Sequence, residues 1–156
     1  MYPCRDLTHE IIAAAIEVHK NLGPGLLESV YLLCLQLEFD HRKIHYQKEL
    51  DVPFFYRDRK IERAFRLDFL VENEVVLELK SNEGLLPVHE AQLLTYLRLT
   101  NKQVGLLINF NVSLLKTGIH RCILTDKKPI NTELESRRRD AEMLATNRPS
   151  LNEVQS

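Results

Sequence analysis

Three charged residues stand inside apolar segments of the sequence, where ionisable side chains are uncommon. Asp68 interrupts FRLDFLV, and Glu78 and Lys80 interrupt VVLELKS. In an extended chain alternate side chains share a face, so Glu78 and Lys80 lie on the same side of their strand. An ionised carboxylate in a mostly buried strand is costly unless it is paired or bound to a metal ion. If Asp68 lies beside them, the three residues suit a divalent cation site that hydrolyses phosphodiesters.

The polar segment Glu72-Asn73-Glu74 predicts that Asp68 and Glu78 do meet. It is a tight turn between two apolar segments, so the flanking strands should be antiparallel neighbours. Two converging carboxylates repel each other, and a cation such as Mg²⁺ removes that repulsion. Lys80 could hold or deprotonate the attacking water, or neutralise the charge that develops on phosphorus. A structural salt bridge from Lys80 to Glu78 or Asp68 is the alternative, which an E-x-K pattern alone would favour.

Two helical segments carry further candidates. His89, Gln92 and Tyr96 recur at steps of three and four, so one helical face would present an amide and a phenol to the site. A half-buried Tyr with a solvated Gln fits this pattern, taken alone, at least as well. Glu28 and Tyr31 lie one turn apart in GPGLLESVY. Glu28 is either a third carboxylate that reaches the metal or an acid that the helix dipole favours, and periodicity does not decide between the two.

These residues need a sheet with helices packed against it, and the apolar patterning predicts one. We expect helices at residues 6–22, 26–42 and 87–99. We expect strands at 44–53, at two segments of 54–69 around the polar turn 57–60, at 75–81, at 104–110 and at 119–124. The continuous apolar run VGLLINF is typical of a strand covered on both faces. The order predicts an α/β or α+β fold with a central mixed sheet.

Composition and charge narrow the class of protein. The 156 residues, 44% hydrophobic and 28% charged, are typical of one soluble domain, expected at residues 1–124, with a polar tail at 125–156 that is partly helical or disordered. The 21 basic and 22 acidic residues give no overall signal for nucleic acid, so such binding must depend on local patches. Neither a signal peptide nor a membrane-spanning segment is indicated. A cytoplasmic location without a membrane partner is expected.

The hairpin before Asp68 is a candidate local patch. It carries Arg57, Arg59, Lys60, Arg63 and Arg66, opposed only by Asp58 and Glu62. A basic turn near a metal site could hold phosphates, and an ordinary solvated hairpin is an equal alternative. In the tail, Arg137-Arg138-Arg139 is surrounded by acidic residues and fits a solvated helix better.

Together these motifs resemble those of one known family, the GxxExxY proteins, a branch of the PD-(D/E)xK nuclease superfamily with the restriction-endonuclease-like fold. The signature G-x-x-E-x-x-Y is matched by Gly25, Glu28 and Tyr31, the D…E-x-K by Asp68, Glu78 and Lys80, and the Q-x-x-x-Y element of RecB-like nucleases by Gln92 and Tyr96. The resemblance runs from about residue 7 to residue 124 and includes GLLINF. Leu67 replaces the proline of the superfamily name, and Asn111 replaces an expected Gly. The three core catalytic positions keep their expected types.

By this resemblance the chain would have an αβββαβ core, with helices on both sides of the sheet, and would be a metal-dependent nuclease. Asp68 and Glu78 would bind Mg²⁺ or Mn²⁺, together with Glu28 as the acidic residue of the first motif. Lys80 would act on the attacking water.

The resemblance also implies a nucleic-acid substrate, with DNA favoured over RNA. Gln92 and Tyr96 would assist substrate placement. The expected substrate contacts are Tyr31, Arg57, Arg59, Lys60 and Arg66. A homodimer would double the binding surface. The alternative from another class is a nucleic-acid-binding or structural subunit that keeps the nuclease fold without turnover.

Overall fold

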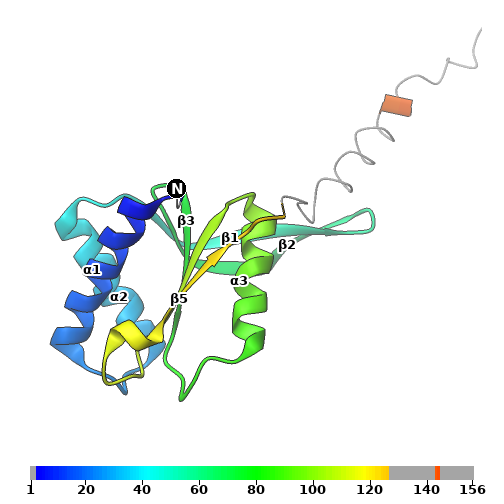
Figure 1. Cartoon of the computed structure of the whole chain (residues 1–156). Coiled ribbons are helices and arrows are strands. Elements are labelled where there is room, and N and C mark those ends of the chain that lie inside the picture. The colour runs from blue at the N-terminus through cyan, green and yellow to red at the C-terminus, as the bar shows by residue number, and fades with distance from the viewer. Residues whose placement is uncertain (1–2, 127–142, 145–156) are drawn as a thin grey trace, which may run out of the picture.

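A five-stranded mixed sheet lies between helices, as Figure 1 shows. The computed structural model describes residues 3–126 and 143–144. Its elements in chain order are α1 (Arg5–Leu22), α2 (Glu28–Arg42), β1 (Tyr46–Tyr56), β2 (Arg59–Val71), β3 (Val75–Lys80), α3 (Pro87–Thr100), β4 (Val104–Asn109), the 3₁₀ helix η1 (Leu115–Gly118) and β5 (Ile119–Ile123). The predicted fold, a mixed sheet flanked by helices with an αβββαβ core, is therefore confirmed. The tail predicted at 125–156, including Arg137-Arg138-Arg139, lies almost entirely outside the described residues.

The strands follow the sheet in chain order, from β1 at one edge to β5 at the other. β2 and β3 are antiparallel across a tight turn in which Glu72 and Asn73 have positive φ angles of 50° and 55°. β3 and β4 are parallel because α3 carries the chain back between them. The carboxyl ends of β3 and β4 therefore lie side by side at the same end of the strands, with Lys80 opposite Asn109.

Each face of the sheet has its own apolar core. α1 and α2 cover one face, where Leu77 and Leu79 of β3 are buried, and α3 covers the other, where Val76 is buried. Because both faces are covered, β3 and β4 have the nearly continuous apolar sequences that the strand prediction relied on. Glu78 is the charged exception, with only 5% of its surface exposed.

One strand boundary differs from the prediction. The break expected after Pro53 is absent, because β1 continues to Tyr56 with a register shift between Val52 and Phe54. Proline has no N–H to donate to a neighbouring strand, so it is found in edge strands and at irregularities of pairing. Pro53 meets both conditions, because β1 is an edge strand and its register shifts at this residue. The consequence is a long β1–β2 hairpin that projects beyond the rest of the sheet, as Figure 1 shows.

Among the described residues, no helix combines the length and the apolar character that crossing a membrane requires.

Candidate active site

Asp68 and Glu78 meet where the pairing of β2 and β3 ends. The regular ladder runs from Val71 opposite Val75 to Phe69 opposite Leu77 and stops there. Beyond it, the Asp68 backbone N–H donates to Glu78 Oε1 at 3.0 Å, and the Leu79 N–H donates to Asp68 Oδ2 at 2.7 Å. Each carboxylate therefore takes the place of a backbone acceptor on the neighbouring strand. The adjacency predicted from the turn is present, and both side chains are held by main-chain donors.

Burial makes ionisation of this pair unfavourable. Burial is the largest cause that raises the pKa of Asp68, to about 6, and the charges of Glu28 and Glu49 add to it. Burial is also the largest cause that raises the pKa of Glu78, to about 8, and the charge of Asp68 is the second cause. The hydrogen bonds from the backbone and the charge of Lys80 act in the opposite direction without cancelling the rise. The metal-free pair therefore binds protons at a pH where ordinary carboxylates are ionised.

Lys80 lies two residues beyond Glu78, and its charge lowers the pKa of both acids. It forms no ion pair within 4 Å among the described residues, whose salt bridges all lie elsewhere. The structural salt bridge considered from the sequence is thus not formed. The ammonium group is half-buried near both carboxylates, where it can contact a third group, such as water or a phosphate oxygen.

The outer oxygen of each acid is available to a ligand. Asp68 Oδ1 and Glu78 Oε2 take part in none of the hydrogen bonds found among the described residues. Neither oxygen is among the buried side-chain atoms that lack a hydrogen-bond partner in the described part of the chain. Both oxygens therefore reach solvent, and a hard cation could bind them without breaking the existing backbone contacts.

The third helix brings Tyr96 and Gln92 to this side of the sheet. Tyr96 is 4% exposed, and its hydroxyl accepts a hydrogen bond from Gln92 Nε2 at 2.9 Å. Burial raises the pKa of Tyr96, and the charges of Glu78 and Asp68 add to the rise, which places the phenol close to the acidic pair. His89 instead accepts from the Leu86 N–H through Nδ1 and so caps the helix. Of the three residues on the predicted helical face, Tyr96 lies near the acidic pair and Gln92 is hydrogen-bonded to Tyr96, whereas His89 caps the helix.

Glu28, the acidic residue of the G-x-x-E-x-x-Y motif, lies near the acidic pair. Glu28 begins α2 and is half-buried, and its charge raises the pKa of both Asp68 and Glu78. Among the described residues, however, no three acidic, His or Cys side chains are close enough to form a metal-binding group. Glu28 therefore lies toward the pair, and its role as a third ligand stays a prediction.

Tyr31 is fully buried and fixes the loop before Glu28. Its hydroxyl donates to Gly23 O at 2.6 Å and accepts from the Leu26 N–H at 3.2 Å, and its ring stacks on Phe110 with centroids 4.4 Å apart. Ser81 just after Lys80 donates to Leu26 O at 2.6 Å, which joins the same loop to the end of β3. The structure thus places Tyr31 inside the protein, as a support for Glu28, and away from a substrate surface.

Glu49 is a neighbour of the site that the sequence patterns did not indicate. It lies in β1 between Lys48, which pairs with Phe69, and Leu50, which pairs with Leu67, so it faces Asp68. Its φ angle is +51°, a left-handed conformation that is unusual inside a strand. The alternation of side chains along β2 is also irregular here. Leu67 and Phe69 are two residues apart and would share a face in a regular strand, but Leu67 packs with the α3 core and Phe69 with the α1–α2 core. Glu49 is thus a fourth acidic residue in this region, after Asp68, Glu78 and Glu28, and only the three-dimensional structure reveals it.

The basic hairpin is not assembled around the acids. Arg57, Arg59 and Lys60 lie at its tip, next to the turn between β1 and β2. Asp68 follows Arg59 by nine positions of extended chain, a span of about 30 Å. Arg66 lies nearer, but it pairs with Asp51 at 3.8 Å and donates to the Glu49 carbonyl at 3.4 Å. The turn that carries Arg57, Arg59 and Lys60 therefore lies away from the acidic pair, and a role of these residues in substrate binding stays a prediction.

Asn109 fixes the loop that follows Lys80. Its Oδ1 accepts from the N–H groups of Asn82 and Asn111, and its Nδ2 donates to Asn82 O. We expect Asn109→Ala to lower the free energy of unfolding by about 2 kcal/mol, because two backbone donors lose their acceptor. The melting temperature should fall by about 6 °C in a thermal scan. Asn111→Ala is the matched control, since it removes only one bond to Asn82, and an equal fall would contradict this role.

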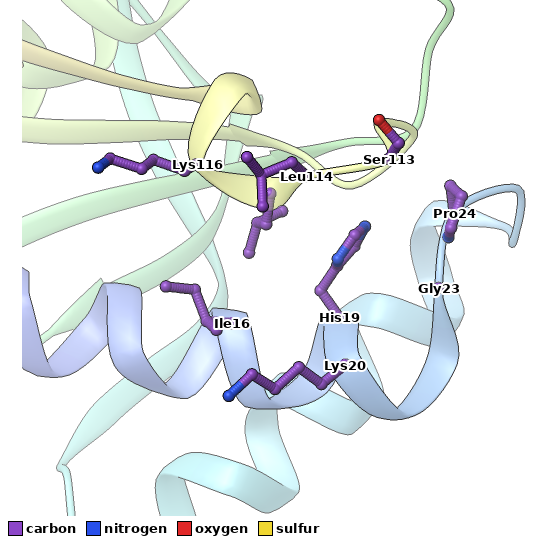
Figure 2. A pocket seen from close by; sticks show the side chains of 9 residues that line it. Ile16, His19, Lys20, Gly23, Pro24, Ser113, Leu114 and Lys116 are labelled. Atoms are coloured by element: carbon purple, nitrogen blue, oxygen red, sulfur yellow. The ribbon is translucent and has the colours of Figure 1, made fainter.

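A separate pocket of about 460 Å³ lies between the end of α1 and the segment after β4. Figure 2 shows His19 in this pocket with Lys20 and Lys116 at different sides of it. The lining residues are Ile16, His19, Lys20, Gly23, Pro24, Ser113, Leu114, Leu115 and Lys116. His19 Nε2 is 2.8 Å from Val112 O, so this nitrogen carries the proton and donates. None of the acidic pair, Lys80 or Tyr96 lines this pocket.

Comparison with known proteins gives one match. The family model described as the PD-(D/E)XK nuclease superfamily matches residues 5–122, which include all the elements from α1 into β5. No curated protein and no solved structure matches the chain significantly.

Proposed function

Because the chain belongs to the PD-(D/E)XK nuclease superfamily, which generally hydrolyses phosphodiester bonds, we propose that it is a metal-dependent nuclease with Asp68, Glu78 and Lys80 as its catalytic centre. One observation carries the proposal. The buried carboxylate of Glu78 and the half-buried carboxylate of Asp68 converge with raised pKa values, and Lys80 beside them forms no ion pair with any described residue. A structural role would be served better by apolar side chains or by a closed salt bridge.

The donor set fits a hard divalent cation. Asp68 and Glu78 each present one oxygen that forms no hydrogen bond with the described residues, and Mg²⁺ or Mn²⁺ typically takes one or two carboxylates with water and phosphate oxygens. When bound, such an ion supplies Lewis-acid polarisation of the phosphate and lowers the pKa of bound water. The backbone donors on both acids orient the two carboxylates in advance, which gives the site its fixed geometry.

The other residues act on the substrate and the water. Lys80 holds or deprotonates the nucleophile, or stabilises the negative charge on the phosphorus oxygens. The charge of Glu28 near the pair adds to the attraction for a cation, although Glu28 does not join a three-ligand group among the described residues. Tyr96 and Gln92 present a phenol and an amide that can donate to phosphate or sugar oxygens.

Finer assignments follow from the combination of motifs. We assign the chain to the GxxExxY branch on Gly25, Glu28 and Tyr31, whose loop the structure connects to the active-site edge. We propose DNA as the substrate, Mg²⁺ or Mn²⁺ as the ion and the cytoplasm as the location. A homodimer is also proposed, because so small a domain has limited surface for substrate binding.

The contribution of Gln92 gives one prediction. Gln92 is exposed on α3, and its amide contacts only the Tyr96 hydroxyl among the described residues. Gln92→Ala should lower kcat/KM for nucleic-acid cleavage about tenfold by loosening the phenol, while the melting temperature stays within about 1 °C. The measurement is initial cleavage rate against substrate concentration. Thr95→Ala, on the same helix, is the control and should keep its rate; a normal rate in Gln92→Ala would remove Gln92 from the site.

The proposed activity is tested directly by a substrate panel. Single- and double-stranded DNA and RNA are incubated with the full chain in Mg²⁺, in Mn²⁺ and in chelator. Cleavage should require the metal and should be lost in Asp68→Ala and in Lys80→Ala. Equal residual cleavage in wild type and both variants would identify a contaminant, and metal-independent binding without cleavage would identify a non-catalytic module.

A further inference from the structure

The far end of the β1–β2 hairpin is exposed and projects beyond the rest of the sheet. We define the arm as residues 54–63, in which Phe54 pairs with Ile61, Phe55 with Lys60 and Tyr56 with Arg59. Every residue from 56 to 64 is exposed, and in the described part of the chain the tip is held by the pairing of its two strands. Figure 1 shows this ribbon extending away from the helices. A long exposed ribbon of this kind has no evident role in stabilising the fold.

The arm carries an excess of positive charge, with Arg57, Arg59, Lys60 and Arg63 against Asp58 and Glu62. Lys60 pairs with Glu62 at 3.5 Å, and Arg63 pairs with Asp51 at 4.0 Å. Arg57 and Arg59, in contrast, have no carboxylate within 4 Å in the described part of the chain. The Arg57 guanidinium lies 5.8 Å from the ring centroid of Tyr56, which is 60% exposed. The tip therefore presents two arginines and an aromatic ring to a partner.

The base of the arm is fixed to the active-site helix. Phe65 contacts Phe54 with centroids 5.8 Å apart and contacts Tyr96 at the same distance. Tyr96 in turn lies beside the acidic pair. Because β2 runs without interruption from Arg59 to Asp68, the tip stands about 30 Å from the carboxylates along the strand. Duplex DNA rises about 3.4 Å per base pair, so this span corresponds to about nine base pairs.

We propose that the arm binds duplex DNA about nine base pairs from the scissile phosphate, with Arg57 and Arg59 on backbone phosphates. The proposal rests on the proposed nuclease function and specifies its substrate as an extended duplex. A two-stranded ribbon fits the major groove of B-DNA, whereas the major groove of duplex RNA is too deep and narrow. Charge also favours a polyanion over a second copy of this chain, whose net charge is close to zero.

The test measures binding and not cleavage, so its result is independent of the proposed activity. Fluorescence anisotropy gives the Kd of the full chain in chelator for duplex DNA of 8 and of 24 base pairs. The double variant Arg57→Ala/Arg59→Ala is compared with the control Arg63→Ala, which removes an arginine that already has a carboxylate partner. All three residues are exposed, and thermal scans check that each variant folds.

The double variant should bind the 24-base-pair duplex about tenfold more weakly than wild type, and the slope of log K against log salt should fall by about two. The 8-base-pair duplex cannot reach the site and the tip together, so wild type should bind it more weakly than the 24-base-pair duplex. Equal affinity of the double variant and Arg63→Ala for the long duplex would overturn the proposal. The proposal would also be overturned if the double variant lost as much affinity for single-stranded DNA or duplex RNA as for duplex DNA. A third contrary result would be a wild-type dimer in sedimentation that the double substitution dissociates, because the arm would then bind a second copy of the chain.

Discussion

Lys80→Met should reduce the rate of metal-dependent cleavage about a thousandfold while leaving the fold intact. The ammonium is the only cation shown near both carboxylates in the described part of the chain, and it has no ion-pair partner there. A positioned general base or charge stabiliser typically contributes 10²–10⁴-fold to a rate. The free energy of unfolding should change by less than about 1 kcal/mol, since no short salt bridge is lost.

The control for this prediction is Lys102→Met, a half-buried lysine after α3. It should cleave at the wild-type rate. Single-turnover cleavage of labelled DNA gives the rate, and a chemical-denaturation curve gives the stability. A Lys80→Met protein that is fully active, or one whose loss of activity equals its loss of folded fraction, would remove Lys80 from the catalytic centre.

Glu78→Gln should abolish cleavage and, at alkaline pH, stabilise the metal-free protein. The raised pKa means that folded Glu78 keeps a proton that the unfolded chain releases at about pH 4.5. The folded state therefore binds more protons between about pH 4.5 and 8, and wild-type stability falls as pH rises through that window. A Gln amide does not ionise, so the variant does not lose stability as the pH rises through this window. Its Oε1 can still accept the hydrogen bond from the Asp68 N–H. The gain at pH 8.5 should be on the order of 2 kcal/mol, or about 5 °C.

The pH and metal dependence separate this effect from ordinary packing. At pH 4 the melting temperatures of wild type and Glu78→Gln should be nearly equal, because Glu78 is protonated in both folded and unfolded wild type. At pH 8.5, Mg²⁺ should raise the melting temperature of wild type and not of the variant. The control Glu83→Gln alters an exposed acid in the loop after β3 and should behave as wild type. A destabilised Glu78→Gln at pH 8.5 would mean that the carboxylate is structural.

The central part of the site could be predicted because it depends on local geometry. A three-residue turn between two apolar strands allows little variation in register, so Asp68 and Glu78 had to be near neighbours. Helical spacing likewise predicted that Gln92 and Tyr96 share a face, and they are hydrogen-bonded. Alternation along β3 placed Glu78 and Lys80 on the face opposite the α1–α2 core. Each of these relations spans only a few residues of chain.

The features whose positions the sequence did not predict depend on tertiary contacts or on irregular backbone. Arg57 and Arg59 are close to Asp68 in sequence, but an extended strand carries them about 30 Å away from it. Tyr31 was assigned to the substrate because of its motif, whereas the packing of α2 buries it completely. Glu49 has no motif, and its left-handed backbone opposite Asp68 has no sequence signature such as glycine. Pro53 suggested a strand end that a register shift avoids.

The most direct test of the metal site is calorimetric titration of Mn²⁺ into the full chain at pH 8 and low salt, beside the Asp68→Asn variant. We expect wild type to bind Mn²⁺ with release of protons from the acidic pair, and we expect the variant to show no saturable heat. Identical titrations of the two proteins, or no uptake by wild type, would contradict the claim that Asp68 and Glu78 form a divalent cation site.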